Sequence, residues 1–134
     1  MKTTLSLMYH CVYSNNNKLT GFQNKGAFDY KISDTIFRKQ VEAISTYLNE
    51  NSIKLVFPIF TFDDGGVSFY ENIAPICEEY NHKCIFFIST KFIGTKGFLT
   101  SKQIANLHKR GHIIAAHSHS HPDDMSLLSD YEIN

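Results

Sequence analysis

Short apolar segments alternate with longer amphipathic ones along this chain, and the alternation restricts the folds that it can adopt. Four segments are short, apolar and bounded by polar or glycine-containing stretches, which predicts strands at residues 5–9, 55–62, 84–90 and 113–116. Between them, apolar residues recur at the spacing of a helix. Such alternation favours an α/β fold in which helices connect parallel strands, as in barrels and doubly wound sheets.

Three helices are predicted to connect these strands, at residues 33–49, 73–80 and 100–110. Ser33 is a suitable N-cap for the first helix, because a serine hydroxyl can accept a hydrogen bond from the first turn. Thr100 and Gln103 form a capping-box pattern at the start of the third helix. Residues 13–26 are polar and contain asparagine and glycine, so they are expected to form a loop.

Composition excludes several classes of protein. The 134 residues are enough for one domain with a single hydrophobic core. Thirteen basic and thirteen acidic residues cancel, so charge gives no indication of a nucleic-acid or membrane-surface partner. Three cysteines without CxxC spacing argue against a disulfide framework and fit a reducing compartment. Without an evident signal peptide or an apolar run of about 18 residues, we expect a cytoplasmic protein that does not enter membranes.

Polar side chains follow two of the predicted strands, at the point where each strand ends. Asp63 and Asp64 come after the second strand, and three histidines come after the fourth: His117, His119 and His121. The carboxyl ends of parallel strands meet at one rim of a sheet, which is where α/β proteins bind their ligands. The two polar clusters are therefore expected to lie on the same rim.

Adjacent carboxylates at a partly buried strand end need a compensating charge, because burial and mutual repulsion disfavour two ionised groups. A divalent cation would supply that charge, and one Asp oxygen with two imidazole nitrogens leaves open positions for water and substrate. If Asp64 is the ligand, Asp63 points differently and is free to take a proton from water. The alternate spacing of the histidines allows two of them to converge. Gly65 and Gly66 permit a sharp turn and a close approach of substrate.

Simpler interpretations exist for each cluster by itself. An Asp-Asp pair before glycine is commonly a turn or a helix N-cap, and a histidine near a strand end is commonly a surface group. A histidine-rich tract can also be a disordered metal scavenger, although the apolar strand directly before this one argues against disorder. The presence of both clusters on one predicted rim favours a metal site over these alternatives.

Two motifs resemble those of a known family. The sequence TFDDG at residues 61–65, followed by His-Ser-x-x-His-Pro at residues 117–122, is similar to the first two motifs of the polysaccharide deacetylases, the NodB-homology domains of carbohydrate esterase family 4. The segments LMYH, CIFFIST and RGHIIAAHS resemble the same family. The resemblance implies the first half of a distorted (β/α) barrel of the polysaccharide deacetylase type, with parallel strands and flanking helices.

The resemblance also implies roles for individual residues. Three of them would bind one divalent metal ion, commonly zinc and in some members cobalt, nickel or manganese: Asp64, His117 and His121. Asp63 would be the general base, and Ser118 would make a hydrogen bond that orients a ligand histidine. Gly65 would line the pocket, and His10 would either line it or make a local loop contact. His119 falls on a variable position of the motif and is assigned no role.

The implied reaction is hydrolysis of an acetyl group on a carbohydrate, N-acetyl in preference to O-acetyl, with an acetylated oligo- or polysaccharide as the substrate. The metal ion would polarise the acyl carbonyl and lower the pKa of a bound water, and Asp63 would deprotonate that water. The balanced charge and the lack of a long apolar run, rather than the resemblance, lead us to expect no nucleic-acid partner and no membrane partner.

Family members are typically longer and carry later motifs, with an arginine, an aspartate and Leu-x-x-His, which this sequence lacks. We therefore interpret residues 1–134 as a partial polysaccharide deacetylase catalytic domain without its C-terminal half. Four strands cannot close a barrel, so an exposed sheet edge is expected to promote self-association. One alternative is a catalytically incomplete remnant that binds metal or carbohydrate. Another, an amidohydrolase-like His-x-His at His119 and His121, fits less well because that motif belongs after the first barrel strand.

Overall fold

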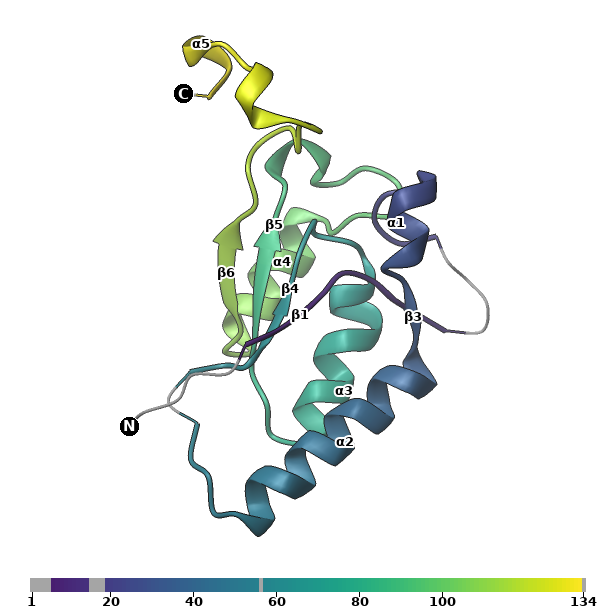
Figure 1. The fold of residues 1–134 in the computed structure, drawn as a ribbon, viewed down its shortest axis with the longest axis vertical. Coiled ribbons are helices and arrows are strands. Elements are labelled where there is room, and N and C mark those ends of the chain that lie inside the picture. Colours follow the sequence, from purple (N-terminus) through teal and green to yellow (C-terminus); the bar gives the residue numbers. More distant parts are fainter. Residues whose placement is uncertain (1–5, 15–18, 56, 134) are drawn as a thin grey trace.

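Four parallel strands form the central sheet of this chain (Figure 1). The computed structural model describes residues 6–14, 19–55 and 57–133. The strands lie side by side in the order β1 (Leu7–Tyr9), β4 (Phe60–Phe62), β5 (Cys84–Ile88) and β6 (Ile113–Ala116). Every pairing in this sheet is parallel, which confirms the fold class predicted from the alternation of strands and helices.

Three helices pack with the sheet around one core: α2 (Asp34–Glu50), α3 (Ala74–Glu79) and α4 (Ser101–Lys109). Ser33 caps α2, because its Oγ accepts a hydrogen bond from the backbone of Ile36 at 3.3 Å. The predicted capping box of Thr100 and Gln103 forms in both directions at the start of α4. A π-helical segment, η1 (Phe69–Ile73), leads into α3, so this helical region begins earlier than predicted.

Short helices complete the carboxyl-terminal half of the chain: η2 (Thr90–Phe92), η3 (Met125–Leu127) and α5 (Asp130–Ile133). The last two project beyond the carboxyl ends of the strands, away from the core (Figure 1). Within the described ranges, no helix is both long enough and apolar enough to cross a membrane.

The expectation that residues 13–26 form only a loop is wrong. This stretch contains the end of β2 (Val12–Tyr13) and the start of α1 (Lys25–Asp29), while residues 15–18 lie outside the described part. β2 pairs with β3 (Ile32–Ser33) in a second, parallel sheet of two strands. Asn24 caps α1, because its side chain accepts a hydrogen bond from the N–H of Ala27 at 2.8 Å. These elements are too short to show an apolar period in the sequence.

β4 is shorter than the strand predicted at residues 55–62. The first hydrogen bond to β1 is accepted by the carbonyl of Ile59. Pro58 precedes it and has no N–H, so it cannot extend the ladder of hydrogen bonds. Phe57 is accordingly 67% exposed, and Val56 lies outside the described residues. The strand predicted at residues 84–90 likewise ends early, at the last residue of β5, whereas β6 has the predicted bounds.

Phenylalanine rings fill the space between the sheet and the helices. Phe60, Phe62 and Phe86 point from the strands into the core, where each is fully buried. The ring of Phe62 packs against Phe37 of α2 and against Phe69 of η1, with ring centroids 5.7 and 5.8 Å apart. These contacts fix how α2 and η1 sit on the sheet, and therefore where the loops at the carboxyl ends of the strands begin.

The opposite face of the sheet is more open. A row of residues crosses it in register, one from each strand: Met8, Thr61, Ile85 and Ile113. The two ends of this row are exposed, because Met8 is 58% and Ile113 is 42% accessible to solvent. The edge strands β1 and β6 carry these two residues.

We propose that the chain self-associates through this open sheet, because an unprotected edge strand is a template for pairing. Ile113→Lys on β6 should shift the chain toward the monomer, since a charge on an edge strand opposes pairing. Sedimentation velocity over a range of protein concentrations measures the shift. Ile36→Lys is the matched control, because Ile36 is 51% exposed on α2. A chain that stays monomeric at every concentration contradicts the proposal.

A buried histidine links β5 to α3. The side chain of His112 is fully buried, and its Nδ1 accepts a hydrogen bond from the N–H of Cys84 at 3.1 Å. That bond leaves the proton on Nε2, which lies 3.1 Å from Oε1 of Glu78. Glu78 also pairs with Arg110 and Lys83. Burial lowers the pKa of His112 below its ordinary value of 6.5, and the nearby Glu78 carboxylate opposes that shift.

The chain should lose stability as the pH falls below 6.5, and part of the loss should come from His112. The unfolded chain binds this proton before the folded chain does, so the free energy of unfolding falls by at most about 1.4 kcal/mol per pH unit. His112→Asn keeps an acceptor for Cys84 but does not titrate, so its stability should fall less steeply. Urea unfolding from pH 8 to pH 5, with chelator present, compares the two slopes. Equal slopes contradict this role of His112.

Candidate metal centre

The two polar clusters lie at the same rim, at the carboxyl ends of β4 and β6. Asp63 follows β4, and its N–H donates to the carbonyl of Tyr9 in β1 at 3.0 Å. His117 follows β6, and its N–H donates to the carbonyl of Ile88 in β5 at 2.9 Å. The first residue after each strand is therefore hydrogen-bonded to the neighbouring strand. These bonds restrict where the side chains that follow can lie.

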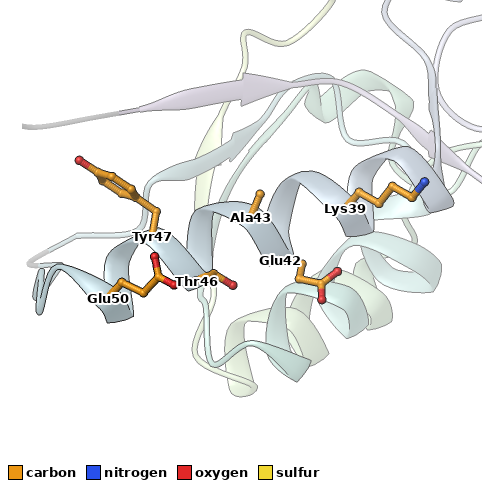
Figure 2. Close-up of a pocket in the computed structure, with 6 residues that line it drawn as sticks. All are labelled: Lys39, Glu42, Ala43, Thr46, Tyr47 and Glu50. Atoms are coloured by element: carbon orange, nitrogen blue, oxygen red, sulfur yellow. The ribbon is translucent and has the colours of Figure 1, made fainter.

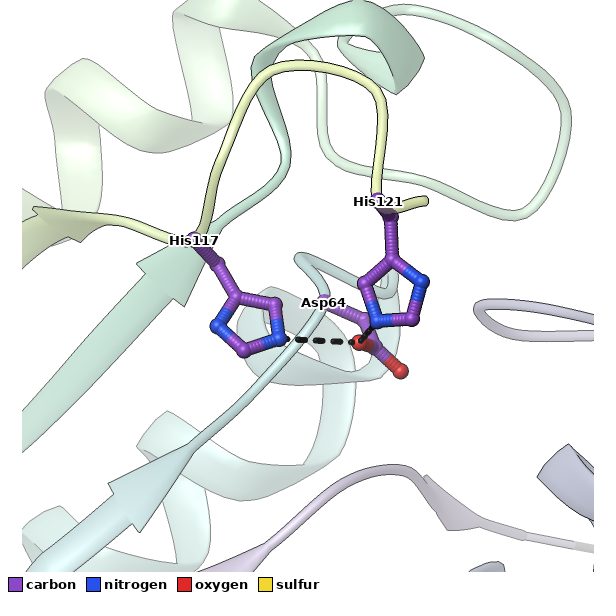
Figure 3. A group of neighbouring side chains, drawn as sticks. All are labelled: Asp64, His117 and His121. Carbon is purple, nitrogen blue, oxygen red and sulfur yellow. Dashed lines mark ion pairs between the residues drawn. The ribbon is translucent and has the colours of Figure 1, made fainter. Parts of the chain in front are cut away.

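Three side chains converge at this rim (Figure 3): Asp64, His117 and His121. One candidate ligand atom from each lies within 4.8 Å of the others. Oδ1 of Asp64 is 3.1 Å from Nε2 of His121 and 3.6 Å from Nε2 of His117. Both imidazole rings are directed at the same carboxylate. The structure thus brings together the three residues to which the sequence motifs assign a metal ion.

The carboxylate of Asp64 is buried and incompletely paired. Its side chain is 6% exposed, and within the described part of the chain Oδ1 receives no hydrogen bond of normal geometry. The approach of His121 is an ion pair only when that ring is protonated. A buried carboxylate without a partner is costly, and a divalent cation between it and the two imidazoles would remove that cost. One oxygen and two nitrogen donors fit zinc and related divalent ions.

The turn after β4 separates the two aspartates. Asp64 has a φ of +86°, in the left-handed region, and Gly65 follows with a φ of +95°. A Cβ on Gly65 would lie 3.1 Å from Cγ2 of Ile88, so glycine suits both the backbone and the packing here. The carbonyl of Asp64 accepts a hydrogen bond from the N–H of Ser89 at 3.2 Å. This backbone buries Asp64 and leaves Asp63 half-buried beside it.

Asp63 lies among groups that oppose one another electrostatically. Burial raises the pKa of Asp63 above its ordinary value of 3.8, and the Asp64 carboxylate adds to the rise. His117 and His10 oppose it, because a positive charge favours the ionised carboxylate. A carboxylate with a raised pKa accepts a proton more readily than a fully solvated aspartate. The assignment of Asp63 as general base stays a prediction.

The loop after β6 is held by its own hydrogen bonds. Ser118 and His121 both have left-handed backbones, with φ values of +59° and +51°. Oγ of Ser118 accepts a hydrogen bond from the backbone N–H of His121 at 3.0 Å. Ser118 therefore contacts the backbone of the candidate ligand rather than its imidazole. His119 lies outside the Asp64 group, and its Nδ1 is 2.8 Å from Oγ1 of Thr90.

His10 lies directly after β1, next to the end of β4. Its ring packs on Tyr30, with centroids 4.7 Å apart, and Tyr30 is 59% exposed. This local loop contact is one of the two interpretations of His10. A role in the pocket stays a prediction, which the influence of His10 on the pKa of Asp63 supports.

Phe22 is a neighbour of the site that sequence reasoning missed. The centroid of its ring lies 4.7 Å from that of His121. Phe22 belongs to the stretch expected to form a loop, where it is part of no motif, so only its position in the fold reveals it.

Two hollows of the surface lie away from the Asp64 group. One of about 480 Å³ runs along α2 (Figure 2), lined by Lys39, Glu42, Ala43, Thr46, Tyr47 and Glu50. Another of about 380 Å³ is lined by Leu55, Phe57, Pro58, His82, Lys83, Gly111 and Ile113, which include the start of β6 rather than its carboxyl end. Neither contains a residue of the Asp64 group, so the candidate site is identified by its donor atoms.

Known proteins resemble this chain in sequence and in fold. The family model described as polysaccharide deacetylase matches residues 54–134. A protein of Bacillus subtilis (strain 168) named "Putative polysaccharide deacetylase YxkH" is 29% identical over 119 residues, which cover 86% of this chain and 42% of that protein. The chain thus spans less than half the length of this curated relative.

Two solved structures share the fold. BC0361, a polysaccharide deacetylase from Bacillus cereus, superposes with a TM-score of 0.72 at 19% identity, over 98% of this chain and 43% of that one. The deacetylase PplD of Streptococcus pyogenes, in complex with acetate, superposes with a TM-score of 0.66 at 21% identity, over 97% of this chain and 64% of that one. These matches confirm the α/β fold of the deacetylase barrel type.

The family inferred from two short motifs is confirmed by a match that extends well beyond them. It begins before β4 and includes β5, α4 and β6 together with both polar clusters. Since the match covers more than half of the sequence, this chain belongs to the polysaccharide deacetylase family.

Proposed function

We propose that this chain supplies the metal ligands and the general base of a hydrolase that removes acetyl groups from a carbohydrate. Membership of the polysaccharide deacetylase family supports carbohydrate deacetylation. The observation that carries the proposal is the buried Asp64 carboxylate facing two imidazoles at the carboxyl ends of the strands. Because the chain spans 42% of the length of its Bacillus subtilis relative, the activity of a complete deacetylase is part of the proposal.

Three residues would hold one divalent ion: Asp64, His117 and His121. Zinc is the first candidate, and cobalt, nickel and manganese are the alternatives. When bound, such an ion supplies a Lewis acid that polarises an acyl carbonyl and favours the ionisation of water near neutral pH. His117 and His121 would bind as neutral imidazoles and Asp64 as a carboxylate. The three ligands together would then carry one negative charge, which partly balances a divalent cation.

Asp63 would take a proton from the attacking water on one of its carboxylate oxygens. The left-handed turn at Asp64 supports separate roles for the two aspartates, because it buries Asp64 and leaves Asp63 half-buried. Burial strengthens Asp63 as a base, because it raises the pKa of the carboxyl group above its ordinary value.

The substrate that we propose is an oligo- or polysaccharide that carries N-acetyl groups in preference to O-acetyl groups. Hydrolysis breaks the bond between the acyl carbon and nitrogen, forms acetate and leaves an amine that takes up a proton. A remnant that binds metal or carbohydrate without catalysis would use the same ligands but release no acetate, so metal content and acetate must be measured together.

The chain should bind one divalent ion, and His117→Ala combined with His121→Ala should abolish binding, because two of the three ligands are then missing. Metal content after dialysis is measured by mass spectrometry. The matched control combines His108→Ala with His119→Ala, which removes two exposed histidines outside the group and should leave metal content unchanged. Affinity should also weaken as the pH is lowered, since ligand imidazoles must be neutral. Equal metal content in the unchanged chain, the double variant and the control would contradict the proposed metal site.

In a complete protein that contains this segment, the two aspartates should respond differently to substitution by asparagine. Asp63→Asn should leave the metal bound and lower kcat by about 10²–10⁴-fold, through loss of a positioned base. Asp64→Asn should lower metal content and activity together, through loss of a charged ligand. Acetate release from an N-acetylglucosamine oligomer is assayed on samples of known metal content.

Three results would count against these assignments. Full activity in Asp63→Asn means that this residue is not the base. Loss of metal from Asp63→Asn alone means that the two roles are reversed. Metal binding without acetate release in the unchanged complete protein favours the non-catalytic remnant.

A further inference from the structure

We propose that Phe22 is a positioning residue for His121, which holds the imidazole toward Asp64 so that the ligand set is arranged before a metal ion arrives. The inference rests on the proposed function, because it takes Asp64, His117 and His121 as the ligand set. Phe22 lies outside residues 54–134, so the family match gives it no role.

The evidence begins with how the His121 ring is held. Its Nε2 approaches Asp64 at 3.1 Å, and the described residues give the imidazole no hydrogen bond of its own. A metal-binding histidine is ordinarily oriented by a hydrogen bond from its second ring nitrogen. The contacts that His121 does make are with rings: Phe22 at 4.7 Å between centroids and His117 at 5.3 Å. Ring packing therefore takes the place of the usual hydrogen bond.

Phe22 is itself braced by two other rings. It meets Phe92 at a centroid distance of 4.8 Å and Phe98 at 5.0 Å, both in edge-to-face geometry. Phe92 and Phe98 stack on each other at 5.0 Å. Edge-to-face and stacked contacts favour particular ring orientations, so this group restricts how Phe22 can turn.

The backbone that carries Phe22 is also fixed. The N–H of Gly21 donates to the carbonyl of Gly97 at 2.8 Å, and Oγ1 of the buried Thr20 accepts from the N–H of Ser68 at 3.0 Å. Gly21 has a φ of +61°, and a Cβ there would lie only 2.6 Å from Sγ of Cys11. Phe22 thus follows directly after two residues that have little room to move.

The consequence concerns affinity for the metal rather than the fold. An imidazole that is free to rotate must be ordered when the metal binds, and that ordering weakens binding. A ring that packing already holds in place loses little rotational freedom when the metal binds. Sites whose supporting residues fix the ligands work in the same way. Removing the Phe22 ring should therefore weaken metal binding, while the main core cluster, which includes neither Phe22 nor the two rings that brace it, keeps its packing.

The test measures Zn²⁺ affinity by competition with a chromophoric chelator, together with the visible absorption spectrum of bound Co²⁺. Phe22→Leu should lower Zn²⁺ affinity about 10-fold, the lower end of the range for residues that support ligands, and should alter the Co²⁺ bands. Phe22→Tyr keeps the ring and should restore both. Phe57→Leu is the matched control, because Phe57 is 67% exposed and belongs to the hollow away from the Asp64 group.

A second measurement separates positioning from general loss of structure. The metal-free Phe22→Leu chain should still unfold cooperatively, with a melting temperature only slightly lower because its edge-to-face contacts with Phe92 and Phe98 are lost. The NMR signal of the His121 ring carbon should shift because the ring current of Phe22 is gone. Unchanged Zn²⁺ affinity in Phe22→Leu, or an equal loss in Phe57→Leu, overturns the role of Phe22 and leaves the metal site standing. If the unchanged chain binds neither Zn²⁺ nor Co²⁺, the proposed function fails and this inference fails with it.

Discussion

A carboxylate buried at the end of a strand is the constraint on which the rest of this rim depends. The side chain of Asp64 is 6% exposed, and the described residues leave one of its oxygens without a hydrogen bond of normal geometry. The nearby backbone is also strained, since Asp64, Ser118 and His121 adopt left-handed conformations that cost about 1–3 kcal/mol each in residues with side chains. Strain of this kind persists only where surrounding contacts enforce it. Among the described residues, three of the five non-glycine residues with such a backbone lie around this carboxylate, and the other two, Ser52 and Asn81, follow the ends of α2 and α3. That concentration argues for a binding site rather than an incidental turn.

Much of the architecture follows from local patterns in the sequence. Ser33 and the pair Thr100 and Gln103 mark the starts of α2 and α4 correctly, because each helix begins with hydrogen bonds that the cap residue itself makes. The convergence of Asp64 with the two histidines follows from a general rule, because parallel strands place their carboxyl ends on one rim. Motif and topology point to the same residues, which is why this part of the site is accessible without a structure.

The remaining features depend on contacts between segments that are distant in sequence. β2, α1 and β3 span too few residues for a periodic pattern, and β2 finds its partner in a segment well separated from it. The start of β4 depends on Pro58, which lacks the N–H that a longer ladder would need. Phe22 is one phenylalanine among eleven in the sequence, and nothing local marks it as the one beside His121.

The pairing of β4 determines where this chain can accept insertions. β4 has only three residues and pairs in register on both sides, with Thr61 opposite Met8 and Ile85. Side chains alternate between the faces of a strand, so one extra residue within β4 would exchange the buried and open sets and displace Asp64 from the histidines. Residues 51–55, which are exposed and lie between α2 and β4, carry no such restriction. Insertions and deletions among related chains should accordingly occur in the segment before β4 and not within β4 itself.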